Sequence, residues 1–199
     1  MKQIDQSRFP PSRISLKNGL QPLIRFLQES DENALGDFFG SVPHEDYRFY
    51  RGGPLTRKLA HTMAGDASDP QRVVLILVAP TGEIGGFNWC AWKQGSAASV
   101  FGICIRRGFQ NIGAGAALME RLIAIARVVG PPEMCLTVQL ANPRAVRLYQ
   151  QMGFRIVRQQ MRNASNIFPA EPEYFMSRKT IDTDDSPNSE ASRPPLGAD

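Results

Sequence analysis

The sequence has no long apolar run and few residues of the types that bind metals or form disulfides. No stretch approaches the roughly 18 consecutive apolar residues that a membrane-spanning helix needs, and 42% hydrophobic and 21% charged residues are ordinary for a soluble globular domain. The chain has three cysteines and two histidines, with no Cys-x-x-Cys spacing. A disulfide framework and a metal site are therefore not expected, and the thiols are predicted to be reduced and buried.

The two ends of the chain differ in composition from its middle. The opening "MKQIDQSRFPPSRISLKNG" has two prolines and no apolar core segment, so it is not expected to be a secretory signal, and a cytoplasmic protein is predicted. The last twenty residues are polar, acidic and proline-bearing. We expect a flexible N-terminal arm over 1–20, one folded domain over 21–179 and a disordered acidic tail over 180–199.

The formal charge of +4 hides an asymmetry between this tail and the rest of the chain. Five of the 19 acidic residues but only one of the 23 basic residues lie in 180–199, which leaves 22 basic and 14 acidic residues in the body. Such a body attracts anions. Its arginines are dispersed, with neither a recognition-helix pattern nor a basic and aromatic stacking platform, so nucleic acid is not favoured as a partner.

Apolar periodicity and turn residues predict alternating strands and helices. The segment 97–105 is a predicted strand, 116–129 is the best amphipathic helix, and 133–140 is again a strand, an order that implies a right-handed crossover between parallel strands. The fold class is therefore α/β, or mixed α+β, with a central sheet. Further strands are predicted at 22–28, 72–79, 84–93, 154–159 and 173–179, and further helices at 30–40, 54–65 and 143–152.

A basic, glycine-rich turn, "RRGFQNIGAG", connects the strand 97–105 to the best helix. Unpaired amides at a helix start, together with glycines that permit close approach, favour a phosphate group. A P-loop would need Lys followed by Ser or Thr where Ala116 and Ala117 stand, and a dinucleotide site would need a third small residue where Leu118 stands. The remaining ligand is coenzyme A, and the alternative is a tight turn that binds nothing.

Two motifs in order resemble the GNAT superfamily of acetyl-CoA-dependent N-acyltransferases. The first is a Gln-x-x-Gly-x-Gly turn, and the second is an Asn-x-x-Ala-x-x-Leu-Tyr-x-x-x-Gly-Phe segment. Their matched residues are Gln110, Gly113 and Gly115, followed by Asn142, Ala145, Leu148, Tyr149, Gly153 and Phe154. The resemblance implies a central mixed, mostly antiparallel sheet with two splayed parallel strands, flanked by about four helices.

The resemblance also implies roles for individual residues in binding acetyl-CoA. Tyr149 matches the position whose hydroxyl donates a proton to the departing thiolate, although a tyrosine on a helix can equally pack its ring. Asn142 is either a ligand or simply a helix cap. The other expected cofactor-binding residues hold the pantetheine arm by their backbone or surround the diphosphate: Ile103, Ile105, Arg107, Gln110, Asn111, Ile112, Gly113, Ala114 and Gly115.

The sequence does not identify a single residue as the general base. Many relatives place a carboxylate on the strand before the glycine turn, but 97–105 has none. Deprotonation through water is an alternative to the acidic and histidine candidates, which are His44, Glu45, Asp46, Glu171 and Glu173.

The sequence therefore predicts an N-acetyltransferase that acts on a primary amine of a small molecule or a protein. A non-catalytic module that only binds coenzyme A remains the alternative. No membrane partner is expected, and the exposed sheet edges of such folds leave a homodimer open.

Overall fold

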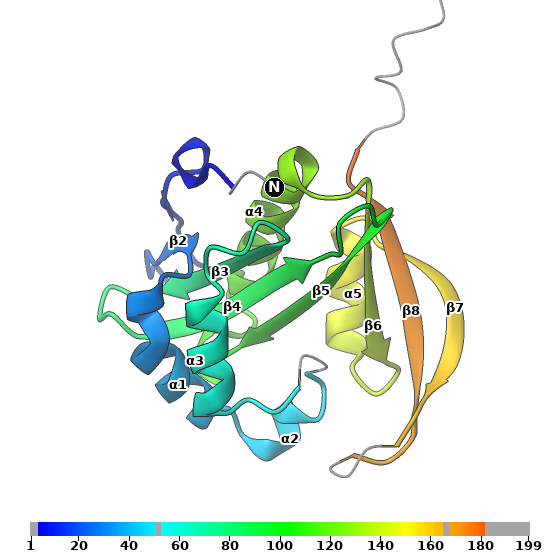
Figure 1. Cartoon of the computed structure of the whole chain (residues 1–199). Coiled ribbons are helices and arrows are strands. Elements are labelled where there is room, and N and C mark those ends of the chain that lie inside the picture. The colour runs from blue at the N-terminus through cyan, green and yellow to red at the C-terminus, as the bar shows by residue number, and fades with distance from the viewer. Residues whose placement is uncertain (1–3, 51–52, 165–167, 182–199) are drawn as a thin grey trace, which may run out of the picture.

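The computed structural model describes residues 4–50, 53–164 and 168–181. Across these residues, eight strands form a single sheet in the order β1-β2-β3-β4-β5-β6-β8-β7 (Figure 1). The strands are β1 Ser12–Arg13, β2 Leu23–Phe26, β3 Arg72–Val78, β4 Ile84–Ala91, β5 Ala98–Ile105, β6 Glu133–Gln139, β7 Arg155–Arg162 and β8 Glu171–Lys179. The α-helices are α1 Glu32–Gly40, α2 His44–Tyr47, α3 Arg57–Gly65, α4 Ala114–Val129 and α5 Pro143–Gln151.

The sheet confirms the predicted mixed fold. Its described strand pairs are antiparallel except for β5 and β6, which run parallel. The parallel pairing ends at Val100 and Cys135, after which β5 continues beside β4 and β6 continues beside β8. Figure 1 shows the two strands diverging from there, with α5 in the opening. The expected splay is therefore present, and it leaves backbone groups of both strands without a strand partner on that side.

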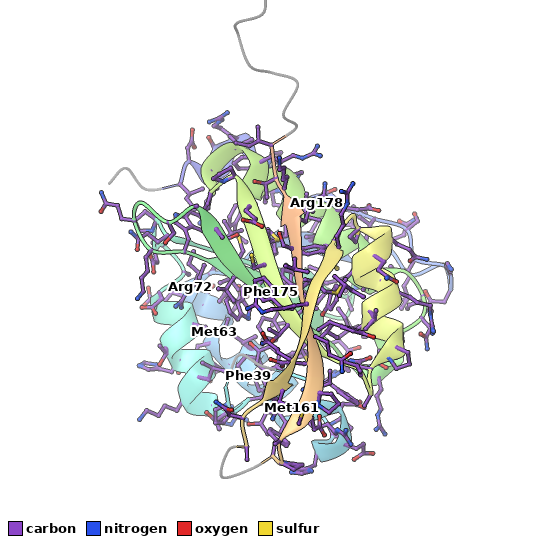
Figure 2. All side chains as sticks on the ribbon, turned by 90° about the vertical axis from the view of Figure 1, so that its right-hand side faces the viewer. Phe39, Met63, Arg72, Met161, Phe175 and Arg178 are labelled. Carbon is purple, nitrogen blue, oxygen red and sulfur yellow. The ribbon has the colours of Figure 1, made fainter. Side chains whose placement is uncertain are left out.

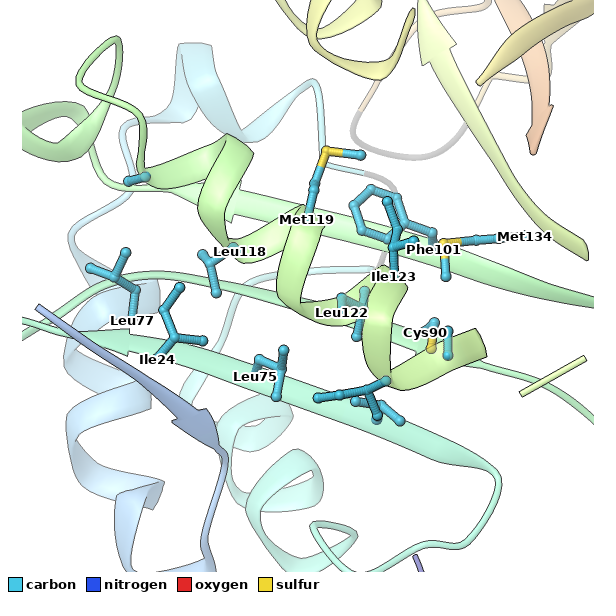
Figure 3. Packing of buried hydrophobic residues seen from close by; sticks show 14 of the residues in the cluster. Ile24, Leu75, Leu77, Cys90, Phe101, Leu118, Met119, Leu122, Ile123 and Met134 are labelled. Carbon is cyan, nitrogen blue, oxygen red and sulfur yellow. The ribbon is translucent and has the colours of Figure 1, made fainter. Parts of the chain in front are cut away.

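The helices cover both faces of the sheet. On one face α4 buries the stripe that its sequence predicts, with Leu118, Leu122 and Ile125 fully enclosed. Figure 3 shows Leu118 and Leu122 pointing onto Leu75 and Leu77 of the sheet, while Met119 and Ile123 lie beside Phe101 and Met134. The helix α4 begins at Ala114, two residues earlier than the predicted 116, so its N-terminus lies directly at the glycine turn.

The opposite face carries α1 and α3. Phe38 and Phe39 of α1 pack on Phe87 of β4, with ring centroids 5.7 and 5.2 Å apart. Because helices cover both faces, the interior of β3 is buried along its length, as its continuous apolar run predicts. The helix α3 begins at Arg57 rather than near Pro54, since the Thr56 hydroxyl accepts from the Leu59 N–H and serves as its cap.

The N-terminal segment contributes more to the fold than a flexible arm would. Within residues 4–20, β1 pairs with β2, and the side chain of Leu16 is buried in the core under α4. The Lys17 N–H donates to the Ile112 carbonyl at 3.0 Å, which attaches this segment to the glycine turn. The expected acidic tail lies outside the described residues from 182 onward.

The other end of the sheet is formed by the β7–β8 hairpin. Figure 2 looks onto this edge, with Met161 on β7 and Phe175 on β8. The Arg158 guanidinium lies 4.1 Å from the centre of the Phe175 ring. None of the described helices combines the length and apolar character that crossing a membrane requires.

Candidate functional site

A cleft of about 730 Å³ lies where β5 and β6 part. Backbone and side chains of β5, the glycine turn, α5 and the segment around α2 form its walls. Seven of the ten cofactor-binding residues expected from the sequence line it, as does Tyr149: Ile103, Ile105, Gln110, Asn111, Gly113, Gly115 and Asn142. Ile112, Ala114 and Arg107 do not line it.

The glycine turn gives α4 an uncapped N-terminus at one end of the cleft. Gly113 is the N-cap residue in a left-handed conformation (φ +100°), and no side chain bonds to the first-turn amides. The first helical bond runs from the Ala117 N–H to the Gly113 carbonyl, so the amides before Ala117 are free of helical partners. An uncapped helix start of this kind suits an anionic group.

Gly115 has a packing role beside any role in binding. A Cβ atom at this position would lie 3.2 Å from Leu148 Cδ2 of α5. The glycine therefore lets α4 and α5 approach closely at the floor of the cleft.

Gln110 connects the turn to its two neighbours. Its Nε2 donates to the Ile105 carbonyl at 2.8 Å, and its Oε1 accepts from Arg144 Nη1 at 2.6 Å. The side chain thus fixes the end of β5 against α5 while lining the cleft. Asn142 caps α5, because its Oδ1 accepts from the Ala145 N–H at 3.2 Å.

Arg107 lies against α2 instead of at the rim of the glycine turn. Its guanidinium bonds to Asp46 and to Glu45, each at 2.7 Å, and these two hydrogen bonds raise the pKa of Arg107. Arg106 likewise pairs with Glu83 and donates to Ser41. Both arginines have carboxylate partners already, so neither is placed to serve a phosphate in the cleft.

Three cationic residues other than Arg107 line the cleft. Lys17, Arg144 and Arg147 line the cleft, and none of them has a carboxylate partner within the part of the chain that the structure describes. Sequence reasoning missed them because Lys17 comes from the N-terminal segment and the two arginines are ordinary surface residues of an amphipathic helix. Arg144 and Arg147 stand one helical turn apart, which was the one available signal.

Tyr149 both packs and faces the cleft. Its ring meets Phe101 edge-on at 5.9 Å between centroids and lies 6.1 Å from Phe154. Burial, with a smaller contribution from Cys104, raises the pKa of the phenol, which therefore stays protonated at neutral pH. Tyr149 thus takes the packing role, and its protonated hydroxyl remains available as a hydrogen-bond donor at the cleft wall.

One carboxylate, that of Asp46, is among the described residues that line the cleft. Beside it lie Phe49, Tyr50 and Cys104. Burial, and secondarily the Asp46 charge, raises the pKa of the Cys104 thiol to about 12, so this cysteine is no nucleophile at neutral pH. The described residues contain no group of three or more His, Cys, Asp or Glu side chains that could hold a metal ion.

The other candidates for the general base are occupied elsewhere. Glu171 pairs with Arg48 at 2.7 Å, and Glu173 is buried and accepts from Gln160 Nε2 at 2.9 Å. Glu45 pairs with Arg107 away from the cleft lining, and its own backbone amide followed by Arg107 lowers its pKa. His44 packs against Tyr47 and Phe168. Asp46 also pairs with Arg107, but it is the one of these five candidates that lines the cleft.

Comparisons with known proteins agree with this architecture. A family model described as the acetyltransferase (GNAT) family matches residues 37–154. A GNAT-family acetyltransferase from Streptococcus pneumoniae is 26% identical, with a TM-score of 0.69, and the match covers 79% of this chain and 99% of that one. A search of curated proteins finds no match.

Two further solved structures share the fold at lower identity. One is a Salmonella typhimurium protein with its cofactor acetyl-CoA (17% identity, TM-score 0.65, 86% of this chain and 99% of that one). The other is spermidine N-acetyltransferase from Vibrio cholerae in complex with CoA and spermine (15% identity, TM-score 0.66, 79% and 94%).

Proposed function

Since the chain belongs to the acetyltransferase (GNAT) family and uses acetyl-CoA, we propose that it acetylates a primary amine by direct attack within a ternary complex. One observation carries the proposal. The same cleft is lined by the uncapped start of α4, by Tyr149 and by Asp46, the one carboxylate among its described lining residues. It therefore combines free amides and cations, which suit an anionic donor, with a carboxylate, which suits a cationic acceptor.

The free amides and cations fit coenzyme A. The first-turn amides of α4 would hold the diphosphate, and Lys17, Arg144 and Arg147 supply positive charge without carboxylates that compete for it. Beyond Val100, the edge of β5 that faces β6 has no strand partner, so backbone groups near Ile103 are available to the pantetheine amides, whereas the Ile105 carbonyl already accepts from Gln110. Acetyl-CoA supplies the activated acyl group.

The carboxylate fits a cationic amine. Asp46 is fixed by Arg107, so its carboxylate is oriented before an ammonium group arrives. An alkylamine has a pKa near 10.4 and must lose a proton before it can attack. We assign that proton to Asp46 or to water bound on it, and the Tyr149 hydroxyl stabilises the departing sulfur. The solved relative that binds spermine supports an amine acceptor.

The test is a panel of amines with release of free thiol as the readout. Acetyl-CoA and longer acyl donors are compared at saturating polyamine, aminoglycoside, amino acid and lysine-peptide acceptors. Amine-dependent thiol release supports the proposal. Tight acetyl-CoA binding with no release from any acceptor contradicts it and favours a coenzyme-binding module.

Asp46→Asn should raise KM for the amine about tenfold or more, the usual worth of a hydrogen bond to a charged group, and should lower kcat as well, because the amide cannot take up the amine proton. The dissociation constant of acetyl-CoA should not change, because Asp46 is assigned to the amine and not to the coenzyme. Glu45→Gln is the matched control, since Glu45 pairs with the same Arg107 but does not line the cleft. Equal effects of both variants would show that α2 docking, and not the Asp46 charge, matters.

A further inference from the structure

A hydrogen bond between two side chains lies beside the point where β5 leaves β6. Trp89 Nε1 donates to the Tyr50 hydroxyl oxygen at 2.9 Å. The Tyr50 ring also packs on Phe87, with centroids 5.7 Å apart, and the residue is only 7% exposed. Its position is therefore fixed by both ring packing and a polar contact.

The backbone of β5 is shaped to admit this contact. Trp89 of β4 stands directly opposite Gly102 of β5, and a Cβ atom on Gly102 would lie 2.6–2.8 Å from three atoms of the indole, including Nε1. The indole therefore lies across β5 at Gly102, because only glycine, which has no Cβ atom, leaves room for it. Gly102 follows the last pair of β5 with β6, that of Val100 with Cys135, so the indole N–H reaches the opening between the strands.

Tyr50 and Tyr149 belong to opposite faces of the sheet. Tyr149 packs in the core under α4, whereas Tyr50 packs in the core under α1 and α3. Both residues nevertheless line the same cleft, together with Cys104 of β5. The cleft thus reaches both sides of the sheet through the gap between β5 and β6, and one phenol from each side lines it.

The Tyr50 hydroxyl can still donate one hydrogen bond. Its oxygen already accepts from Trp89, and none of the described residues accepts its proton. Burial raises the pKa of this phenol, so the proton is retained throughout the neutral range. A hydroxyl that accepts one hydrogen bond becomes a better donor in the next.

On the basis of the acetyl transfer proposed above, we propose that Tyr50 donates a hydrogen bond to the acyl carbonyl oxygen on the acceptor side, and that Trp89 is the positioning residue that holds it. As the amine nitrogen bonds to the carbonyl carbon, the π electron pair moves onto oxygen, which the Tyr50 hydroxyl stabilises. The pair then returns, the C–S bond breaks, and sulfur leaves with its electrons; the nitrogen gives up its extra proton, which ends on that sulfur, so that the products are the neutral amide and CoA. Tyr50 keeps its proton throughout.

The kinetics of four variants test the roles of Tyr50 and Trp89. Tyr50→Phe should lower kcat about tenfold, the worth of one neutral hydrogen bond, and Trp89→Phe should lower it several-fold. The double variant should be no worse than Tyr50→Phe, because Trp89 acts through the hydroxyl. Tyr47→Phe is the control, since Tyr47 lies on α2 and does not line the cleft. If the fall in kcat of the double variant equalled the product of the falls in Tyr50→Phe and Trp89→Phe, the positioning role of Trp89 would be overturned.

A spectroscopic readout separates this inference from the proposed function. The chain has two tryptophans, so the indole N–H signals of ¹⁵N-labelled protein are two, and Trp92→Phe assigns them. If Tyr50 donates to the acyl oxygen, the Trp89 signal differs between complexes with acetyl-CoA and with CoA, and this difference disappears in Tyr50→Phe.

The outcomes are distinct. Identical Trp89 signals in the two complexes overturn the role of Tyr50 and leave acetyl transfer intact. If neither acetyl-CoA nor CoA binds, the proposed function fails, and the role of Tyr50 fails with it.

Discussion

Replacing Gly113 with valine is expected to weaken acetyl-CoA binding about 100-fold. Gly113 has φ +100° at the N-cap of α4, a conformation that costs a β-branched residue about 1–3 kcal/mol. Relief of that strain requires the turn to rotate, which redirects the first-turn amides away from the diphosphate. An energy near the upper end of this range corresponds to about 100-fold in affinity. Isothermal titration calorimetry of both proteins with acetyl-CoA measures this change in the dissociation constant.

The turn between β3 and β4 provides a matched control for this variant. Gly82 has φ +89°, and neither glycine has a neighbouring atom closer than 4.0 Å to an added Cβ. Gly82→Val should therefore destabilise the fold by a similar amount in thermal unfolding while acetyl-CoA affinity stays unchanged. If Gly113→Val bound acetyl-CoA as tightly as the native protein, the diphosphate would not lie on the start of α4.

Local patterns in the sequence predict the elements that this site depends on. The leucine stripe of α4, the apolar run of β3 and the Asn142 cap each depend on neighbours within a few residues, and each appears in the structure as expected. The splay of β5 and β6 follows from the family resemblance, because nothing within either strand states where their pairing ends.

Contacts between distant segments are what the sequence does not reveal. Arg107 precedes the turn that is predicted to bind a phosphate and carries the right charge, but Asp46 and Glu45, some 60 residues earlier, bind it. Lys17 has no motif around it, but its N–H bonds to the Ile112 carbonyl and the residue lines the cleft. A charge identifies the kind of partner a residue prefers, while the tertiary fold decides which one it meets.

The same limit applies to the search for a general base. The family resemblance predicts a carboxylate on β5, but this strand contains none. In the structure, Cys104 occupies that stretch of β5, and the Asp46 carboxylate lies close enough to raise its pKa. Asp46 therefore supplies from α2 a negative charge that β5 lacks.

Tyr149→Phe is expected to lower kcat about 100-fold, in the range for loss of a positioned proton donor, without changing the affinity for acetyl-CoA. Phenylalanine keeps the ring contacts with Phe101 and Phe154, so the fold and the cleft wall should persist. Tyr174→Phe on β8 is the control, because Tyr174 does not line the cleft. Full activity of Tyr149→Phe would remove this residue from the reaction.

The pH dependence of kcat/KM tests the protonation state of the same phenol. Burial raises the pKa of Tyr149 above its ordinary value of 10, so the hydroxyl remains a donor at every pH below that. The native rate should therefore rise with pH as more of the amine becomes neutral, with no decline due to Tyr149 below about pH 10. Tyr149→Phe should show the same rise at a lower level. A decline near pH 8–9 that is present in the native protein and lost in Tyr149→Phe would mean that the phenol ionises there, and that solvent reaches a side chain which the fold keeps buried.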